Sequence, residues 1–224
     1  MKFHTIILGA GPSGLAAALA ASKSGANVAV IDDNFTSGGQ IWRGGAHQQK
    51  DSRAQAMWTE LNNRSHVHFY FQSKVIHAQS CADGYELLIE NTARSEPALR
   101  LQANSIILCT GARELLLPFP GWTLPGVTGA GGLQALCKNG YPVQGKRIVV
   151  AGTGPLLLAV AATLRERGAI VTHIVEQSPL SQLASFGLKL WATPEKIKQS
   201  LQLAWALKDS RYWSNSYVAA AQGK

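Results

Sequence analysis

The chain has 224 residues, of which 46% are hydrophobic, and a formal net charge of +8 at pH 7. No apolar stretch reaches the ~20 residues that a transmembrane helix needs, and the N-terminus runs straight into a strand pattern, so we expect a cytoplasmic protein with neither membrane span nor signal peptide. The three cysteines stand far apart and the basic residues are scattered, which argues against a disulfide framework, a metal cluster and a nucleic-acid partner.

The first half of the chain predicts a β-α-β unit followed by further strands. An apolar strand at 3–8 precedes a helix that starts at Pro12 and is built mostly of Ala and Leu. A second apolar strand follows at 28–31, and Asp83-Gly84 is a hairpin turn signal. The other expected elements are a helix at 54–61, strands at 67–71, 75–78 and 85–89, and a buried strand at 105–109.

The second half repeats the β-α-β pattern. Three prolines within 115–127 mark a turn-rich connection, where we place the boundary between a domain at 1–120 and an incomplete one at 121–224. Beyond it we expect strands at 147–151, 169–175 and 217–221, and helices at 129–138, 155–167 and 194–207. Strands that alternate with helices predict an α/β fold.

The first β-α turn carries a glycine loop with the pattern of a dinucleotide site. Gly9 allows the tight turn, Gly11 lets the backbone approach a pyrophosphate, and Gly14 lets the helix pack close to the strand. Asp32 closes the next strand, where a carboxylate can accept hydrogen bonds from both hydroxyls of an adenosine ribose. The alternative is a tight β-α turn that holds no ligand.

A second loop departs from that pattern at one position. Gly152 and Gly154 fit, but Leu157 stands where the third glycine would be, so the helix has to pack farther from the strand. Glu176 ends the following strand, and a glutamate there favours an unphosphorylated ribose, as in NAD or another adenine nucleotide. The alternative is a Rossmann-like packing domain without a nucleotide.

The order of motifs in the first half resembles that of the two-dinucleotide-binding-domain flavoproteins, the thioredoxin reductase and glutathione reductase superfamily. Gly38-Gly39-Gln40 is similar to the loop that passes the pyrophosphate and ribitol toward the flavin, and residues 107–112 (ILCTGA) are similar to the strand end that closes the FAD domain. Val75 falls where the family contacts adenine through main-chain atoms. The resemblance implies a Rossmann-like FAD-binding domain followed by a partial second Rossmann-like nucleotide-binding domain.

Residues 121–136 and 145–169 resemble a narrower group, the flavoprotein subunits of bacterial amine-oxidising complexes such as opine oxidase, hydrogen cyanide synthase, sarcosine oxidase and dye-linked proline dehydrogenase. The chain corresponds to their N-terminal half, and we expect it to lack the later Gly-Asp segment that holds the flavin ribitol. The resemblance implies an FAD-dependent oxidoreductase subunit that passes electrons between flavin and a nicotinamide or a partner subunit's flavin. The small-molecule substrate would be oxidised on the partner subunit, so we assign no catalytic residue.

The loop patterns and the resemblance together define the candidate cofactor residues. At the FAD site they are Gly9, Gly11, Pro12, Ser13, Gly14, Asp32, Asp33, Gly39, Gln40, Val75, Thr110 and Gly111, and at the second site Gly152, Gly154 and Glu176. Arg43 either places a guanidinium near the flavin or pyrophosphate, or is a surface arginine.

Two other functions stay open at this point. The chain could act alone as a thioredoxin-reductase-like NAD(P)H oxidoreductase, although the disulfide reductases of this superfamily need two cysteines beside the flavin and this chain has no such pair. It could also be a truncated, non-enzymatic nucleotide-binding module.

Overall fold

The computed structural model describes residues 1–91, 98–189 and 193–223. The chain divides into two compact units, Met1–Ala112 and Arg113–Lys224, and each is described by itself.

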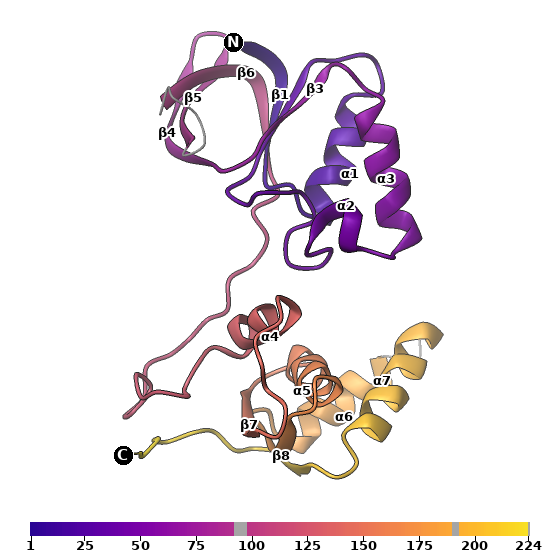
Figure 1. The fold of residues 1–224 in the computed structure, drawn as a ribbon, viewed down its shortest axis with the longest axis vertical. Coiled ribbons are helices and arrows are strands. Elements are labelled where there is room, and N and C mark those ends of the chain that lie inside the picture. Colours follow the sequence, from indigo (N-terminus) through magenta and orange to yellow (C-terminus); the bar gives the residue numbers. More distant parts are fainter. Residues whose placement is uncertain (92–97, 190–192, 224) are drawn as a thin grey trace. The chain divides into compact units, whose positions relative to one another are not determined.

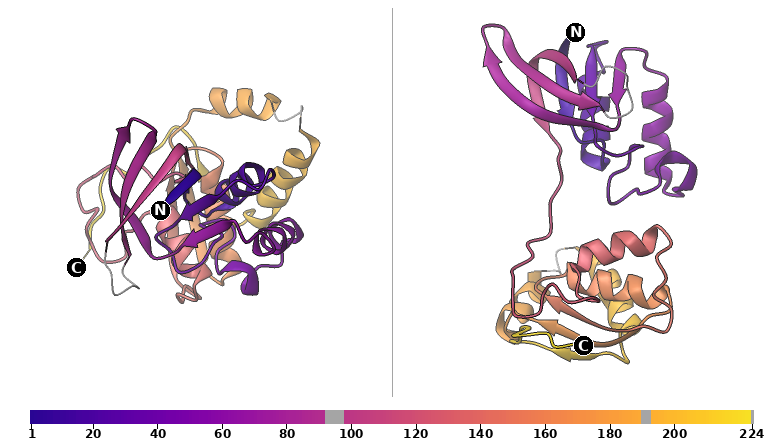
Figure 2. Two further views of the ribbon diagram at one scale, coloured as in Figure 1. Left: turned by 90° about the horizontal axis from the view of Figure 1, so that it is seen from above. Right: turned by 60° about the vertical axis from the view of Figure 1, so that its left-hand side comes forward.

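The first unit is built on a six-stranded mixed sheet with the strand order β3-β2-β1-β6-β5-β4. Strands β1, β2, β3 and β6 run parallel, whereas β4, β5 and β6 pair antiparallel through a hairpin (Figure 2). The elements are β1 (Lys2–Leu8), α1 (Pro12–Ala21), β2 (Val28–Ile31), α2 (Gly45–Gln48), α3 (Ser52–Asn62), β3 (Val67–Tyr70), β4 (Ser73–Cys81), β5 (Gly84–Asn91) and β6 (Ala98–Leu108).

Both faces of β2 are covered, which is why every residue of this strand is buried. Adjacent residues of β1 point to opposite faces. Ile7 packs with Leu15 and Trp58 of α1 and α3, whereas Ile6 packs with Leu87 of the hairpin. Figure 1 shows α1 and α3 side by side, with β4, β5 and β6 on the other side of β1. The carboxyl ends of β1 and β2 therefore sit on a rigid, two-sided core.

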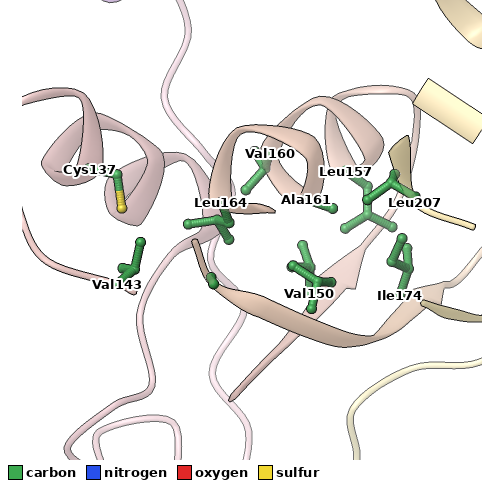
Figure 3. Close-up of a cluster of buried hydrophobic side chains, with 11 residues drawn as sticks. Cys137, Val143, Val150, Leu157, Val160, Ala161, Leu164, Ile174 and Leu207 are labelled. Carbon is green, nitrogen blue, oxygen red and sulfur yellow. The ribbon is translucent and has the colours of Figure 1, made fainter. Parts of the chain in front are cut away.

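The second unit has a three-stranded parallel sheet with the order β7-β8-β9. One hydrophobic cluster packs α5 onto β7 and β8 through residues such as Val160, Leu164, Val150 and Ile174 (Figure 3). The elements are α4 (Ala130–Lys138), β7 (Arg147–Gly152), α5 (Leu156–Glu166), β8 (Ile170–Glu176), α6 (Leu180–Lys189), α7 (Pro194–Ala206) and β9 (Arg211–Trp213).

The structure corrects the sequence analysis at the C-terminal end. Residues 217–221 form no strand; the third strand is β9, where the Trp213 ring packs on His173 of β8 with 4.7 Å between ring centroids. The segment predicted as a strand instead returns to the connection, where the N–H of Ala221 donates to the carbonyl of Pro120 at 2.8 Å. Helix α6 was not predicted, although Leu180, Leu183 and Leu188 recur at helical spacing in its sequence; in the structure it buries no residue.

Two local expectations in the first unit also change. The hairpin turns at 82–83, because Gly84 already pairs with Cys81, and a Cβ at Gly84 would lie 2.3 Å from the carbonyl oxygen of Ala103 on β6. Both the close approach to β6 and a φ of +128° therefore require a glycine at this position. The strand β6 is present, but it is not buried throughout: Leu108 is 72% exposed, since no described helix covers that end.

Candidate functional site

The three glycines of the first loop meet three different spatial demands. A Cβ on Gly9 would lie 2.3 Å from the carbonyl oxygen of Cys109, and one on Gly14 would lie 1.8 Å from the carbonyl oxygen of Gly9. A Cβ on Gly11 would meet nothing closer than the Cα of Gly39 at 3.9 Å. Gly9 and Gly14 are therefore required by the protein's own packing, whereas Gly11 faces open space. A ligand's pyrophosphate would need this space to approach the protein backbone.

Helix α1 begins at this loop, and no side chain of the helix caps or neutralises its N-terminus. Its N-cap is Gly11, with no side-chain cap, Pro12 stands in the first turn, and that turn contains no acidic residue. Ser13 is exposed beside it. The first N–H groups of a helix have no partner within the helix and carry a partial positive charge, so this end is suited to a phosphate.

Asp32 connects the end of β2 to the glycine loop. One carboxylate oxygen accepts from the N–H of Ala10 at 2.6 Å, and the other accepts from the N–H and side-chain amide of Asn34 at 2.8 and 2.7 Å. The residue is 8% exposed, and each carboxylate oxygen can accept more than one hydrogen bond. Asp33 beside it is exposed, and its carboxylate accepts from the Asn34 amide at 3.2 Å. Asp32 is thus buried and bonded to the glycine loop, whereas Asp33 is exposed and bonded to Asn34.

The loop that contains Gly39 and Gln40 lies directly against the first glycine loop. The N–H of Gly38 donates to the carbonyl of Ala10 at 2.8 Å, and a Cβ on Gly39 would lie 3.1 Å from the Cα of Gly11. Gln40, the residue after Gly39, is exposed. The structure therefore brings together two motifs that are far apart in the sequence.

The remaining first-site residues reach the same end of the sheet from β4 and β6. The N–H of Ser73 donates to the carbonyl of Asp32 at 3.0 Å, which places Val75, two residues further along β4, beside the end of β2. Thr110 follows Cys109, whose carbonyl oxygen contacts Gly9. Gly111 has a φ of +72°, and a Cβ added there would meet nothing within 4 Å.

The candidate residues predicted from the sequence omit Ala10 and Asn34, and Gly38 was named only as part of the Gly-Gly-Gln loop. All three act through the backbone or through a neighbour: Ala10 N–H and Asn34 orient Asp32, and Gly38 joins the two loops. Gly38 had a detectable signal, because it stands in a Gly-Gly pair, but Asn34 belongs to no motif.

The second loop is more strongly held by its own protein contacts. Leu157 is 5% exposed and belongs to the core cluster under α5, so the side chain that replaces the third glycine is a packing residue (Figure 3). Gly154 has a φ of +89° and nothing within 4 Å of a Cβ, and the start of α5 has no side-chain cap. The open space beside Gly154 parallels that beside Gly11.

Glu176 holds this loop in place. Its carboxylate accepts from the hydroxyl of Thr153 at 2.9 Å, the N–H of Gly154 at 3.0 Å and the N–H of Ser178 at 2.8 Å, and the residue is 2% exposed. Burial raises the pKa of this carboxyl, but the hydrogen bonds from Ser178, Thr153 and Gly154 outweigh burial and leave the pKa below its ordinary value. The charged form is therefore the one that the fold stabilises.

Replacing Glu176 by Gln is expected to destabilise the second unit by about 1–3 kcal/mol at neutral pH, because the amide cannot accept from all three donors. A lowered folded-state pKa contributes stability above the unfolded-state pKa, and this contribution is lost as the pH falls through the folded-state pKa. The difference between wild type and variant should thus shrink toward low pH in thermal unfolding measured from pH 7 to pH 4. Glu166→Gln, on an exposed position of α5, is the matched control. A pH-independent difference would contradict this account.

Other candidate chemistry in the described residues is limited. Cys81 is exposed, Cys109 is partly buried, Cys137 is buried, and all three are free. The described part of the chain contains no cluster of His, Cys, Asp and Glu that could hold a metal ion. None of its helices is long and apolar enough to cross a membrane. The two glycine loops are therefore the features on which function can be argued.

Comparison with known proteins places these loops in a family. The profile of the pyridine nucleotide-disulphide oxidoreductases matches residues 3–192. An opine oxidase subunit of Rhizobium meliloti (strain 1021) is 33% identical and aligns with 92% of this chain and 46% of its own length. Hydrogen cyanide synthase subunit HcnB of Pseudomonas protegens is 31% identical, over 93% of this chain and 45% of that protein. The chain spans less than half the length of these relatives.

Solved structures agree on the fold. Thioredoxin reductase of T. acidophilum superposes on 100% of this chain and 67% of its own with a TM-score of 0.66 at 19% identity. L-proline dehydrogenase of P. horikoshii covers 79% of this chain and 35% of its own with a TM-score of 0.61 at 21% identity. The predicted α/β, Rossmann-like fold and the resemblance to amine-oxidising flavoprotein subunits are thereby confirmed.

Proposed function

Because the chain belongs to the pyridine nucleotide-disulphide oxidoreductase family, whose members are oxidoreductases that bind FAD and nicotinamide nucleotides, we propose that its first unit binds FAD at the Gly9–Gly14 loop. The observation that carries this proposal is the open side of Gly11. It is the one glycine of the loop that the protein's own packing does not require, and it lies at an uncapped helix N-terminus.

In this proposal each part of the site has a separate task. The backbone at Gly11, Ser13 and Gly14 faces the pyrophosphate, with Pro12 setting the start of α1. Asp32, with Asp33 beside it, faces the adenosine ribose, and Val75 of β4 lines the adenine side. Gly39, Gln40, Thr110 and Gly111 line the path toward the flavin. Support comes from the backbone contacts that bring these segments to one end of the sheet.

The second unit, in the same proposal, binds NAD or another adenine nucleotide through Gly152 and Gly154. The free space at Gly154 and the uncapped start of α5 support this assignment. Glu176 is already bonded to its own loop, so its contribution to the nucleotide is mainly its negative charge. That charge would repel a 2′-phosphate.

We therefore expect NAD to bind more tightly than NADP. Titration calorimetry of the flavin-loaded protein with each nucleotide measures the preference, and Glu176→Gln should reduce it. A preference for NADP, or equal affinities in the wild type, would contradict the assignment of this site.

When bound, the flavin would supply the electron-transfer chemistry, and the chain's own residues would bind and orient it. We propose that the protein acts as a subunit in amine or amino-acid oxidation, exchanging electrons with a nicotinamide or with a flavin on a partner subunit. This is supported by the names of the relatives, which describe subunits of opine oxidase and hydrogen cyanide synthase. The small-molecule substrate would then be oxidised on the partner, and the functional division would follow the proposed domains 1–120 and 121–224.

Two alternative functions make different predictions. A standalone NAD(P)H oxidoreductase needs no partner, but its disulfide-reducing form is not supported here, since the three cysteines, at 81, 109 and 137, form no closely spaced pair in the sequence. A non-enzymatic module would bind a nucleotide without redox chemistry. A cytoplasmic location is compatible with three free cysteines and stays a prediction.

A single spectroscopic experiment separates these functions. The purified chain is reconstituted with FAD, and its flavin absorbance is recorded before and after anaerobic addition of NADH. Bound flavin that bleaches with NADH but not with an amine and a partner subunit supports the standalone enzyme. Bound flavin that bleaches with an amine and a partner subunit supports the proposed role as a subunit. Failure to bind FAD under any condition would refute the proposed function.

A further inference from the structure

Arg43 is a charged residue beside the first site, and its guanidinium is only partly satisfied by the described residues. One guanidinium nitrogen, Nη2, donates to the side-chain oxygen of Gln40. The Nε atom is buried and has no hydrogen-bond partner in the described part of the chain. No ion pair to Arg43 occurs among the described residues either. Gln40 is therefore the one hydrogen-bond partner of this half-buried guanidinium among the described residues.

The loop around Arg43 is fixed in place from both sides. Trp42, its neighbour, is 8% exposed and packs against Trp58 with 5.9 Å between ring centroids. The N–H of Trp42 donates to the carbonyl of Gly38 at 2.9 Å, and Gly38 in turn donates to Ala10 in the first glycine loop. Arg43 thus follows a segment that is anchored to the core and to the glycine loop.

Gln40, the acceptor for Arg43, stands next to the glycine that contacts the first glycine loop. It follows Gly39, and a Cβ on Gly39 would lie 3.1 Å from the Cα of Gly11. The residue that accepts from Arg43 is therefore adjacent to the backbone contact at the open glycine. Gln40 is a positioning residue in this arrangement, since it holds Arg43 without carrying charge.

The electrostatics of this corner favour an anion with several oxygens. Arg stays protonated in proteins and presents five N–H donors in a planar fork that matches phosphate. The first turn of α1 has no acidic residue. The buried acid of this site, Asp32, is engaged by Ala10 and Asn34. The positive charge of Arg43 and of the helix N-terminus therefore lacks a counter-charge from these groups.

We propose that Arg43, held by Gln40, binds the pyrophosphate of the dinucleotide at the first glycine loop. This inference rests on the proposed function and adds a specificity determinant to it: a charged side chain would join the backbone of the glycine loop in recognising the diphosphate. Arg43 would bind ADP and FAD through the same group, because both carry an adenosine with a pyrophosphate.

The test compares FAD binding and ADP binding by the flavin-free chain, with Arg43→Gln as the variant. ADP binding is followed by its competition with FAD, so that only the first site is measured. Both affinities should fall by a similar factor, about tenfold, which is the order expected for one charge-assisted pair. Added salt should weaken the ADP affinity of the wild type more steeply than that of the variant. The reason is that salt screens the charge of Arg43, which the variant lacks. Arg53→Gln is the matched control, since the Arg53 side chain is 83% exposed and pairs with Asp51.

Two further variants separate binding from folding. Arg43→Lys keeps the charge but loses the fork, so it should recover only part of the affinity, and Gln40→Leu should weaken both ligands while leaving thermal unfolding unchanged. A loss confined to FAD would place the guanidinium at the flavin and overturn the pyrophosphate assignment. Unchanged affinities for both ligands in Arg43→Gln would overturn the inference but leave the proposed function intact. A wild type that binds neither ligand would refute the proposed function itself.

Discussion

Gly14→Ala is expected to unfold the first unit or destabilise it by about 3 kcal/mol or more, whereas Gly11→Ala should leave its stability unchanged and weaken FAD binding about 100-fold. The two glycines belong to one motif but face different neighbours. A Cβ on Gly14 would overlap the carbonyl oxygen of Gly9 at 1.8 Å, and neither the loop nor α1 can move apart without breaking the packing under Leu15. A Cβ on Gly11 meets only the Cα of Gly39 at 3.9 Å.

Thermal unfolding and fluorescence titration with FAD measure the two effects separately. Each variant serves as the control for the other, because both add the same methyl group to the same loop. Equal stability losses in the two variants would mean that Gly11 is also a packing residue. Retained FAD affinity in Gly11→Ala would remove the main support for a pyrophosphate at this position.

Asp32→Ala should reduce the affinity for FAD by about 10- to 100-fold, or roughly 1.4–2.7 kcal/mol, because a ribose hydroxyl would lose a charged acceptor. The variant should also lower thermal stability, since the Ala10 N–H and the Asn34 amide lose their acceptor in a site that is 8% exposed. The FAD affinity is measured well below the unfolding temperature, so that only folded protein contributes.

Asp33→Ala is the matched control for Asp32. It removes the same charge one residue away, but Asp33 is exposed and accepts from the Asn34 amide at a longer distance, 3.2 Å. Its effect on FAD affinity should be several-fold smaller. If Asp33→Ala costs as much affinity as Asp32→Ala, long-range charge and not ribose contact would explain the result.

Most of the regular elements could be predicted because their signals are local. The β1-α1-β2 and β7-α5-β8 units each combine an apolar strand, a glycine loop and a helix of small or apolar residues, and the structure places all six within a few residues of the predicted bounds. Helix α6 and strand β9 were not found in this way. Helix α6 buries no residue. Strand β9 has only three residues, and its Trp213 packs on His173 of β8.

The candidate site also has parts with a local sequence signal and parts without one. The glycine pattern, the acids at the ends of β2 and β8 and the Gly-Gly-Gln loop could be identified from the sequence because each has a fixed spacing relative to its own β-α unit. The groups that these two acids bind could not be identified from the sequence. Asp32 and Glu176 occupy equivalent places in the two patterns, and in the structure both are buried and accept three hydrogen bonds from the protein. Asp32 accepts from Ala10 and Asn34, and Glu176 accepts from Thr153, Gly154 and Ser178.

The sequence by itself determined the fold class, the family and the positions of two glycine loops, because backbone freedom and hydrophobic periodicity are properties of neighbouring residues. The glycine pattern predicted separate tasks for Gly9, Gly11 and Gly14, and only the tertiary structure decided which atoms impose them. These atoms are distant in the sequence or brought together by the turn: Cys109 against Gly9, Gly39 against Gly11, and the carbonyl of Gly9 against Gly14. Steric contact is a property of the folded chain, so no spacing along the sequence could reveal it.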